Sequence, residues 1–232
     1  MTTGPTTDPL ATTARSTPKR RSERGTHDRT LVNTILDEAL VCHVGFVADH
    51  APVVLPMTYV RIDDNLYLHG AAGNDMLRHL DRDGDVCVTV TLLDGLVFAR
   101  SAFHHSMNYR CVVLFGRTER VTATAELQRV AAGLLDHLAP GRSRDARPPT
   151  AAELRNTLML RLAITEGSAK VRTGGPLDEP DDLELDVWAG EVPLHLVAQS
   201  PIPDASSTER PELPDYIIDR VAQRSRSSVA GA

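Results

Sequence analysis

The sequence predicts a mainly β protein, an antiparallel barrel with helical insertions. Short apolar or alternating segments recur through the middle of the chain, and most are joined by brief turns rather than by helices. Two or three amphipathic segments of helical period lie between them. Six or seven strands, largely in hairpin order, are therefore expected to form the sheet.

The first half of the chain predicts a helix followed by hairpins. Asp28 is suited to cap a helix that runs to Ala39, because apolar residues recur there at helical spacing. The strands expected next span residues 40–48, 53–61 and 66–69. Pro56 cannot donate to a strand ladder, so it marks an edge or a bulge. Asn74 is suited to cap the helix that follows.

The second half contains the clearest strand, residues 86–93, in which Val alternates with Cys and Thr. Asp94 and Gly95 then predict a turn into another strand. Further elements expected are a strand over 111–121, a helix over 125–138, a helix capped by Thr150 with Glu153, and a strand over 159–165.

One domain, residues 28–197, is expected between two tails. Residues 1–27 are rich in Thr, Pro and Arg and end in a basic cluster, which predicts a disordered basic tail without a secretory signal. Residues 198–232 predict a second, mostly disordered tail with a short helix at 215–224.

Composition excludes several classes of protein. The net charge of −6 and the aromatic content of 4% argue against a nucleic-acid-binding surface, and the apolar runs are too short to span a membrane. Cys42, Cys87 and Cys111 show no metal-ligand spacing, which predicts free thiols in a reducing compartment, the cytoplasm. No metal site is expected.

The most specific stretch is 97–118, in which His104 and His105 precede Asn108, Tyr109 and Arg110. This polar cluster lies at the mouth of an apolar strand, where binding and catalytic side chains are commonly presented. Adjacent histidines on a strand point to opposite sides, so they cannot hold one metal ion together. The alternative is that the pair is simply part of a solvated turn.

A second polar cluster lies near the end of the predicted domain. Ser168, Lys170 and Arg172 alternate, so an extended backbone places them on one face, where two cations and a hydroxyl suit a phosphate or an electron-rich ring. A solvated edge strand protected by charge is the alternative. Trp188, the single tryptophan, is either a core residue or one wall of a ring-binding pocket.

Several segments of the chain resemble a known family. The segments are LVCHVGFV, LPMTYVR, NLYLHGAA, CVTVTLLDGLVFARSAFHHSMNYR, VVLFGR and SAKVRTG, and the resemblance covers about residues 30–196. They resemble the pyridoxamine 5′-phosphate oxidase-like family of FMN-binding split barrels, in its flavin-nucleotide-binding branch related to nitroimidazole reductases. The resemblance implies a six-stranded antiparallel split β-barrel and a homodimer with FMN in clefts at the subunit interface.

The resemblance also implies which residues contact the cofactor. Those expected along the isoalloxazine ring are Pro56, Met57, Thr58 and Tyr59. Those expected around the ribityl phosphate are His69, Gly70 and Asn74. Those expected to approach the flavin from elsewhere are Asn108, Tyr109, Arg110 and Cys111, with Ser168, Lys170, Arg172 and Trp188 completing the site by analogy.

Two positions depart from the family pattern. Asn74-Asp75 stands where the family usually has Ser-Arg or a Lys, which replaces the expected phosphate cation by an anion. Arg78, one turn later on the same helix face, is placed to replace that cation. Cys111 stands where the family usually has Ser, which removes a hydroxyl donor.

Three functions are compatible with these residues. The first is an FMN-dependent oxidoreductase acting on an unidentified small molecule, with His104 or His105 as proton donor or substrate contact. The second is a non-catalytic module that binds FMN, the deazaflavin F420 or haem. The third is a ligand-free dimer with a structural role.

Overall fold

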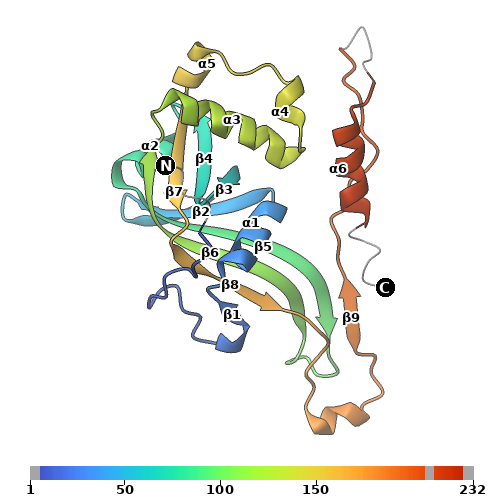
Figure 1. The fold of residues 1–232 in the computed structure, drawn as a ribbon. Helices are drawn as coiled ribbons and strands as arrows, with labels where there is room; N and C mark the ends of the chain where they lie inside the picture. Colours follow the sequence, from blue (N-terminus) through green and yellow to red (C-terminus); the bar gives the residue numbers. More distant parts are fainter. Residues whose placement is uncertain (1–5, 207–211, 227–232) are drawn as a thin grey trace.

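A computed structural model describes residues 6–206 and 212–226, and its centre is a closed ring of six antiparallel strands (Figure 1). In ring order the strands are β2 (Val41–Ala48), β3 (Ala51–Ile62), β4 (Asn65–Ala71), β7 (Thr157–Ala163), β6 (Ser106–Arg120) and β5 (Asp85–Phe98). β5 closes the ring by pairing with both β6 and β2. The six-stranded antiparallel split barrel expected from the sequence is confirmed.

Three further strands extend the sheet beyond the ring. β8 (Glu166–Arg172) pairs with β6, the two-residue β1 (Gly25–Thr26) pairs with β8, and β9 (Gly190–Pro193) pairs with the end of β5. The helices are α1 (Arg29–Glu38), α2 (Asp75–Asp83), α3 (Thr124–Leu138), α4 (Arg142–Asp145), α5 (Ala151–Arg155) and α6 (Asp215–Arg226), with 3-10 turns η1 (Ser22–Arg24) and η2 (Pro180–Glu184).

Two apolar clusters hold the fold together. The larger one fills the barrel and includes one face of α1 and of α2, with Leu36, Leu68 and Leu80 fully buried. The smaller one lies on the outer face of the barrel beneath α3 and α5, where Tyr67 and Met159 are buried. Since side chains alternate between faces along a strand, β4 contributes to both clusters.

The predicted helix starts are confirmed by their caps. The Asp28 carboxylate accepts a hydrogen bond from the Thr30 amide at 2.8 Å, and the Asn74 side chain accepts one from the Leu77 amide at 3.0 Å. Thr150 and Glu153 form the predicted capping box at the start of α5. Each cap satisfies amide groups that the helix leaves unpaired.

The predicted turn at Asp94-Gly95 is wrong. β5 continues through it to Phe98, and the pairing register with β6 shifts between Leu93 and Gly95, which is a β-bulge. A Cβ at Gly95 would lie 3.2 Å from the Val192 carbonyl oxygen, so glycine allows β9 to approach at this point. An Asp-Gly pair therefore marks a bulge here rather than a hairpin.

Residues 6–27 of the expected N-terminal tail contact the barrel, and residues 1–5 lie outside the described part. Leu10 is buried in the larger cluster, and the Ala11 amide donates to the Thr165 carbonyl at 2.7 Å. Arg15 forms a two-point ion pair with Glu166. A single buried leucine and a few polar contacts with β8 thus fix a segment whose composition indicates disorder.

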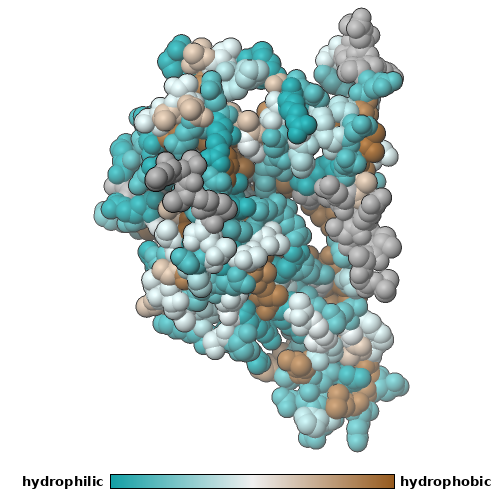
Figure 2. Space-filling view, in the orientation of Figure 1, coloured by the Kyte–Doolittle hydropathy of each residue, from teal (hydrophilic) through white to brown (hydrophobic). Residues whose placement is uncertain are grey.

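The C-terminal part forms an arm that stands apart from the barrel (Figure 1). Residues 194–206 form no helix or strand, and Leu196 and Ile202 are 71% and 93% exposed. The expected short helix is present as α6, held to the α3–α4 corner by a hydrogen bond of 3.0 Å from Arg142 to the Tyr216 hydroxyl. Figure 2 shows open space between the arm and the body. Residues 207–211 and 227–232 of the expected C-terminal tail lie outside the described part.

Within the described residues, the helices are all too short or too polar to cross a membrane.

Candidate functional site

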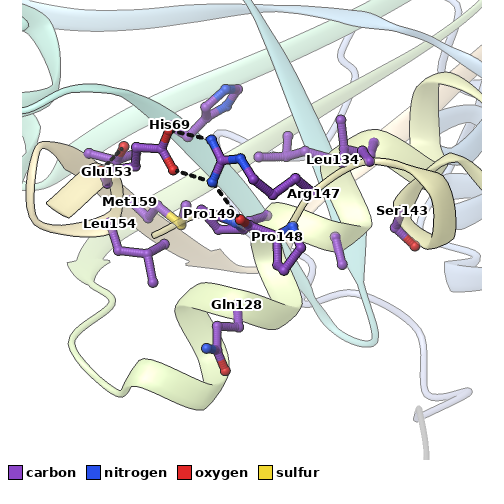
Figure 3. A pocket seen from close by; sticks show the side chains of 15 residues that line it. His69, Gln128, Leu134, Ser143, Arg147, Pro148, Pro149, Glu153, Leu154 and Met159 are labelled. Carbon is purple, nitrogen blue, oxygen red and sulfur yellow. Dashed lines mark hydrogen bonds and ion pairs between the residues drawn. The ribbon is translucent and has the colours of Figure 1, made fainter. Parts of the chain in front are cut away.

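A cavity of about 660 Å³ lies on the outer face of the barrel, between α3, the α4–α5 loop and the strands β4 and β7 (Figure 3). Its apolar walls are formed by Ala131, Ala132, Leu134, Leu135, Leu154 and Met159. The charged side chains of its lining are Arg147 and Glu153, and His69 lies on the barrel wall. The volume and the mostly apolar lining are typical of a small-molecule or cofactor site.

His69 has no hydrogen-bond partner among the described residues. Its Nδ1 atom is sealed from solvent and unpaired, and the residue lines the cavity. Burial lowers the pKa of His69, so its imidazole is neutral at neutral pH. A neutral imidazole with an available nitrogen is a common metal ligand.

The rim of this cavity carries an ion pair. The Arg147 guanidinium donates to the two Glu153 carboxylate oxygens at 2.7 and 3.1 Å and to the Pro148 carbonyl at 2.9 Å. Hydrogen bonds from Arg147 and from Thr150 lower the pKa of Glu153 to about 2, so the carboxylate is charged at neutral pH.

The donor set of the cavity suits a metal carried by a macrocycle rather than a bare ion. Among the described residues no group of three His, Cys, Asp or Glu side chains could hold a metal ion. A haem iron needs only one or two protein ligands, because the porphyrin supplies the other four. One available imidazole in an apolar cavity meets that need.

A second cavity, of about 500 Å³, lies between the β2–β3 hairpin and α2. It is lined by Phe46, Ala48, Asp49, Val53, Leu55, Asp75, Met76, Arg78, His79 and Arg82. Arg78 is exposed and forms no ion pair with any described residue. Its charge is therefore available to an anion, whereas Asp75 in the first turn of the same helix opposes one.

The strand that borders this second cavity has a free edge. Residues 51–58 of β3 pair with β2 alone, and pairing with β4 begins at Tyr59. Backbone N–H and C=O groups along that edge have no ladder partner, and Leu55 beside them is 42% exposed. Such an edge offers alternating donors and acceptors to a flat heteroaromatic ring.

The residues expected around the ring divide between this edge and the core. Pro56 and Thr58 are exposed and Met57 is half-buried, while Tyr59 is 1% exposed. The Tyr59 hydroxyl donates to the Leu36 carbonyl at 2.6 Å, and burial raises its pKa. Tyr59 therefore anchors α1 to the barrel.

The residues expected around the phosphate are separated. Arg78 lies on α2 and lines the second cavity, and Asn74 caps the start of that helix, whereas His69 lines the cavity under α3. Gly70 has a packing role, because a Cβ there would lie 2.9 Å from the Leu77 side chain. The structure thus assigns His69 and Arg78 to two different sites.

The cations of the two sequence clusters are occupied by internal contacts. Arg110 forms two-point ion pairs with both Glu38 and Asp94, which raise its pKa. Arg172 is buried and donates to the Asn108 side chain and to the carbonyls of residues 174 and 175. Neither guanidinium is free to bind a phosphate.

The remaining expected site residues lie outside both cavities. Lys170 donates to the Arg20 carbonyl at 3.0 Å, and Ser168 is buried opposite Val113. Tyr109 and Cys111 are half-buried on β6, and burial raises the pKa of the Cys111 thiol. Trp188 is 67% exposed, so it is not a core residue.

His104 and His105 lie in the turn between β5 and β6. His104 Nε2 lies 3.5 Å from the Glu179 carboxylate, and His105 Nδ1 lies 2.9 Å from the Ser101 carbonyl oxygen. Neither histidine lines the two cavities described above.

Sequence reasoning missed the cavity under α3 and its rim. The capping box around Glu153 was visible, but no local pattern shows that Arg147 reaches the same carboxylate or that α3 covers the face of β4 that carries His69. The one usable signal was His69 itself, a polar residue within an apolar strand.

The chain was compared with known families and structures. The family model described as pyridoxamine 5′-phosphate oxidase matches residues 28–171. The flavocytochrome Anf3 from Azotobacter vinelandii is 36% identical, with a TM-score of 0.86, over 91% of this chain and 98% of that one. The FAD- and haem-binding protein from Mycobacterium smegmatis is 34% identical, with a TM-score of 0.81, over 84% of this chain and 96% of that one.

A more distant structure shares the fold alone. A proposed 5-nitroimidazole antibiotic resistance protein from Bacteroides thetaiotaomicron is 22% identical, with a TM-score of 0.54, over 63% of this chain and 86% of that one. The comparison with curated proteins gives no match. The family model spans more than half of the chain, and the chain therefore belongs to the pyridoxamine 5′-phosphate oxidase-like family of split barrels.

Proposed function

We propose that this protein is a redox protein that binds both a flavin and a haem, and that it acts as an oxidoreductase on a small molecule. The observation that carries the proposal is His69, an unpaired neutral imidazole on the wall of an apolar cavity of about 660 Å³. The names of the two similar solved structures, a flavocytochrome and an FAD- and haem-binding protein, support it.

The cavity under α3 suits a haem in volume and in the chemistry of its lining. Its walls are apolar, the unpaired His69 imidazole would ligate the iron, and the Arg147 guanidinium at the rim suits an anionic substituent. His69 would hold the iron, and the apolar side chains of α3 would exclude water and limit access to it. A haem there would supply one-electron chemistry.

The cavity between β3 and α2 fits a flavin. The free edge of β3 offers backbone donors and acceptors to the ring, and Arg78 offers an unpaired cation to a phosphate. FMN, expected from the sequence, and FAD, named for one similar structure, share both features. A flavin there would supply hydride and electron transfer.

We also propose a cytoplasmic homodimer that completes the flavin site. The β3 edge is open, Val54 and Leu55 beside it are 63% and 42% exposed, and the C-terminal arm presents further exposed apolar residues. A second copy is a suitable cover for these surfaces. The three free cysteines support a reducing compartment. His104 and His105 are retained as candidate substrate contacts.

The test is the visible absorption spectrum of the purified full-length protein, before and after addition of hemin and flavin. Flavin and haem bands are expected, and mass spectrometry of the released ligands distinguishes FAD from FMN. His69→Ala should lose the haem bands and keep the flavin bands. A protein that takes up flavin but no hemin would contradict the haem site, and one that takes up neither would contradict the whole proposal.

A further inference from the structure

We propose that Arg147 is the carboxylate anchor of the cavity under α3, and that Glu153 both orients its guanidinium and limits its affinity for anions. The cavity would thereby select a planar apolar ligand that carries carboxylates, such as the two propionates of a haem. This inference rests on the proposed haem function and adds the recognition of the ligand's acidic edge.

The lining of this cavity contains one positively charged side chain, Arg147, and one negatively charged side chain, Glu153. Its other residues are apolar or uncharged. Figure 3 shows its guanidinium extended toward Glu153, on the side of the cavity where His69 lies. A ligand held by His69 within the apolar walls would therefore meet one cation at the rim. Carboxylates that reach this rim gain a charge-assisted hydrogen bond.

The backbone holds Arg147 in place. Pro148 and Pro149 follow it directly, and their rings fix two successive φ angles in the loop before α5. The Pro148 carbonyl accepts one hydrogen bond from Nη1 at 2.9 Å. Because the loop is stiff, Arg147 loses little freedom when a ligand arrives.

Two N–H groups of Arg147 remain available. A guanidinium has five N–H donors, and three are directed to Pro148 and Glu153. The Nε donor and the second Nη2 donor have no partner among the described residues. Together they form the side-on edge that binds a carboxylate through two parallel hydrogen bonds.

Glu153 acts in two opposite ways. Its carboxylate orients the guanidinium, but its negative charge repels a second carboxylate at the same rim. Replacement by glutamine keeps the capping-box geometry of α5, since Gln serves at that position, and removes the charge. Glu153→Gln should therefore bind an acidic ligand more tightly.

The test compares hemin with hemin dimethyl ester, which has the same ring without free carboxylates. Titrations followed in the haem absorption band would use the full-length wild-type protein, Arg147→Met, Glu153→Gln and the control Arg129→Ala. Arg129 is an exposed arginine of α3 that pairs with Asp63 and does not line this cavity. Arg147→Met keeps the aliphatic stem and should weaken hemin binding about tenfold or more while leaving ester binding unchanged. Glu153→Gln should tighten hemin binding severalfold, and Arg129→Ala should change neither.

The outcomes separate the anchor from the haem site. If hemin binds with a His69-dependent spectrum and Arg147→Met binds it as tightly as the wild type, the anchor is wrong and the haem site stands. If Arg147→Met weakens hemin and ester equally, the effect is structural and the anchor is likewise wrong. If the wild-type protein binds no hemin, both fail. Circular dichroism of each variant verifies the fold.

Discussion

His69 and Met159 are directly opposite residues in the antiparallel ladder between β4 and β7. Their side chains project from the same face of the barrel, and both line the cavity under α3. Cβ atoms of such pairs lie about 4.5–5.5 Å apart. His69 and the buried Met159 therefore form one cross-strand pair on the barrel wall of the cavity.

The first prediction concerns His69. His69→Ala should abolish the haem bands of the hemin-loaded protein, and added imidazole should restore them by filling the space left by the side chain. Absorption spectra with and without imidazole measure this. His104→Ala, which alters a histidine outside the cavity, should leave the bands unchanged. Intact haem bands in His69→Ala would contradict the assignment.

The second prediction concerns pH. Burial lowers the pKa of His69 below its ordinary value of 6.5, so the folded protein takes up this proton at a lower pH than the unfolded chain. The contribution of neutral His69 to the free energy of unfolding has its full value above pH 6.5. It declines as the pH falls toward the folded-state pKa. Urea unfolding of the ligand-free protein between pH 8 and pH 5 should show this decline in the wild type, and less of it in His69→Leu. Equal pH profiles would contradict it.

The third prediction concerns the flavin phosphate. Arg78→Ala should weaken flavin binding by about ten- to hundredfold, because it removes the unpaired cation beside the second cavity. Asp75→Asn should strengthen binding severalfold by removing the opposing charge. Fluorescence quenching of added flavin measures both, with Arg129→Ala as the control. Unchanged affinity in Arg78→Ala would exclude Arg78 as the replacement cation.

The fourth prediction separates structure from cofactor binding. Arg110→Ala should lower the free energy of unfolding by about 1–2 kcal/mol, because Glu38 and Asp94 lose their shared partner. The ion pairs that connect α1 to β5 through Arg110 are lost with it. Flavin affinity should stay within twofold of the wild type. Chemical unfolding measures the free energy of unfolding, and flavin titration of the same preparation measures the affinity. A loss of flavin affinity without a loss of stability would show that Arg110 contacts the cofactor.

Local patterns predicted most of the barrel. Strand alternation located β2 to β7, and the caps at Asp28, Asn74 and Thr150 were read correctly because a cap depends on residues only two or three positions away. The burial of Leu10 was not predictable, since its partners are supplied by distant parts of the chain. The Asp94-Gly95 bulge was missed because the same dipeptide also favours hairpin turns.

The site was less predictable than the fold. Alternation correctly placed Lys170 and Arg172 on one extended strand, but it could not show that Asn108 and two carbonyls occupy Arg172. Likewise, the resemblance placed His69 and Arg78 together at the flavin phosphate. In the structure α3 lies over β4, so His69 lines a separate cavity that does not include Arg78. Side-chain availability depends on the three-dimensional neighbours, and no sequence pattern contains that information.

The short strand β1 has a consequence for how this protein is handled. β1 covers the part of the β8 edge at Ala169 and Lys170, while Leu10 and Arg15 secure the segment before it. A fragment trimmed to start at residue 28 would expose those backbone groups as a template for intermolecular β-pairing. Such a fragment is expected to aggregate during concentration, so crystallisation and solution work should retain the N-terminal segment.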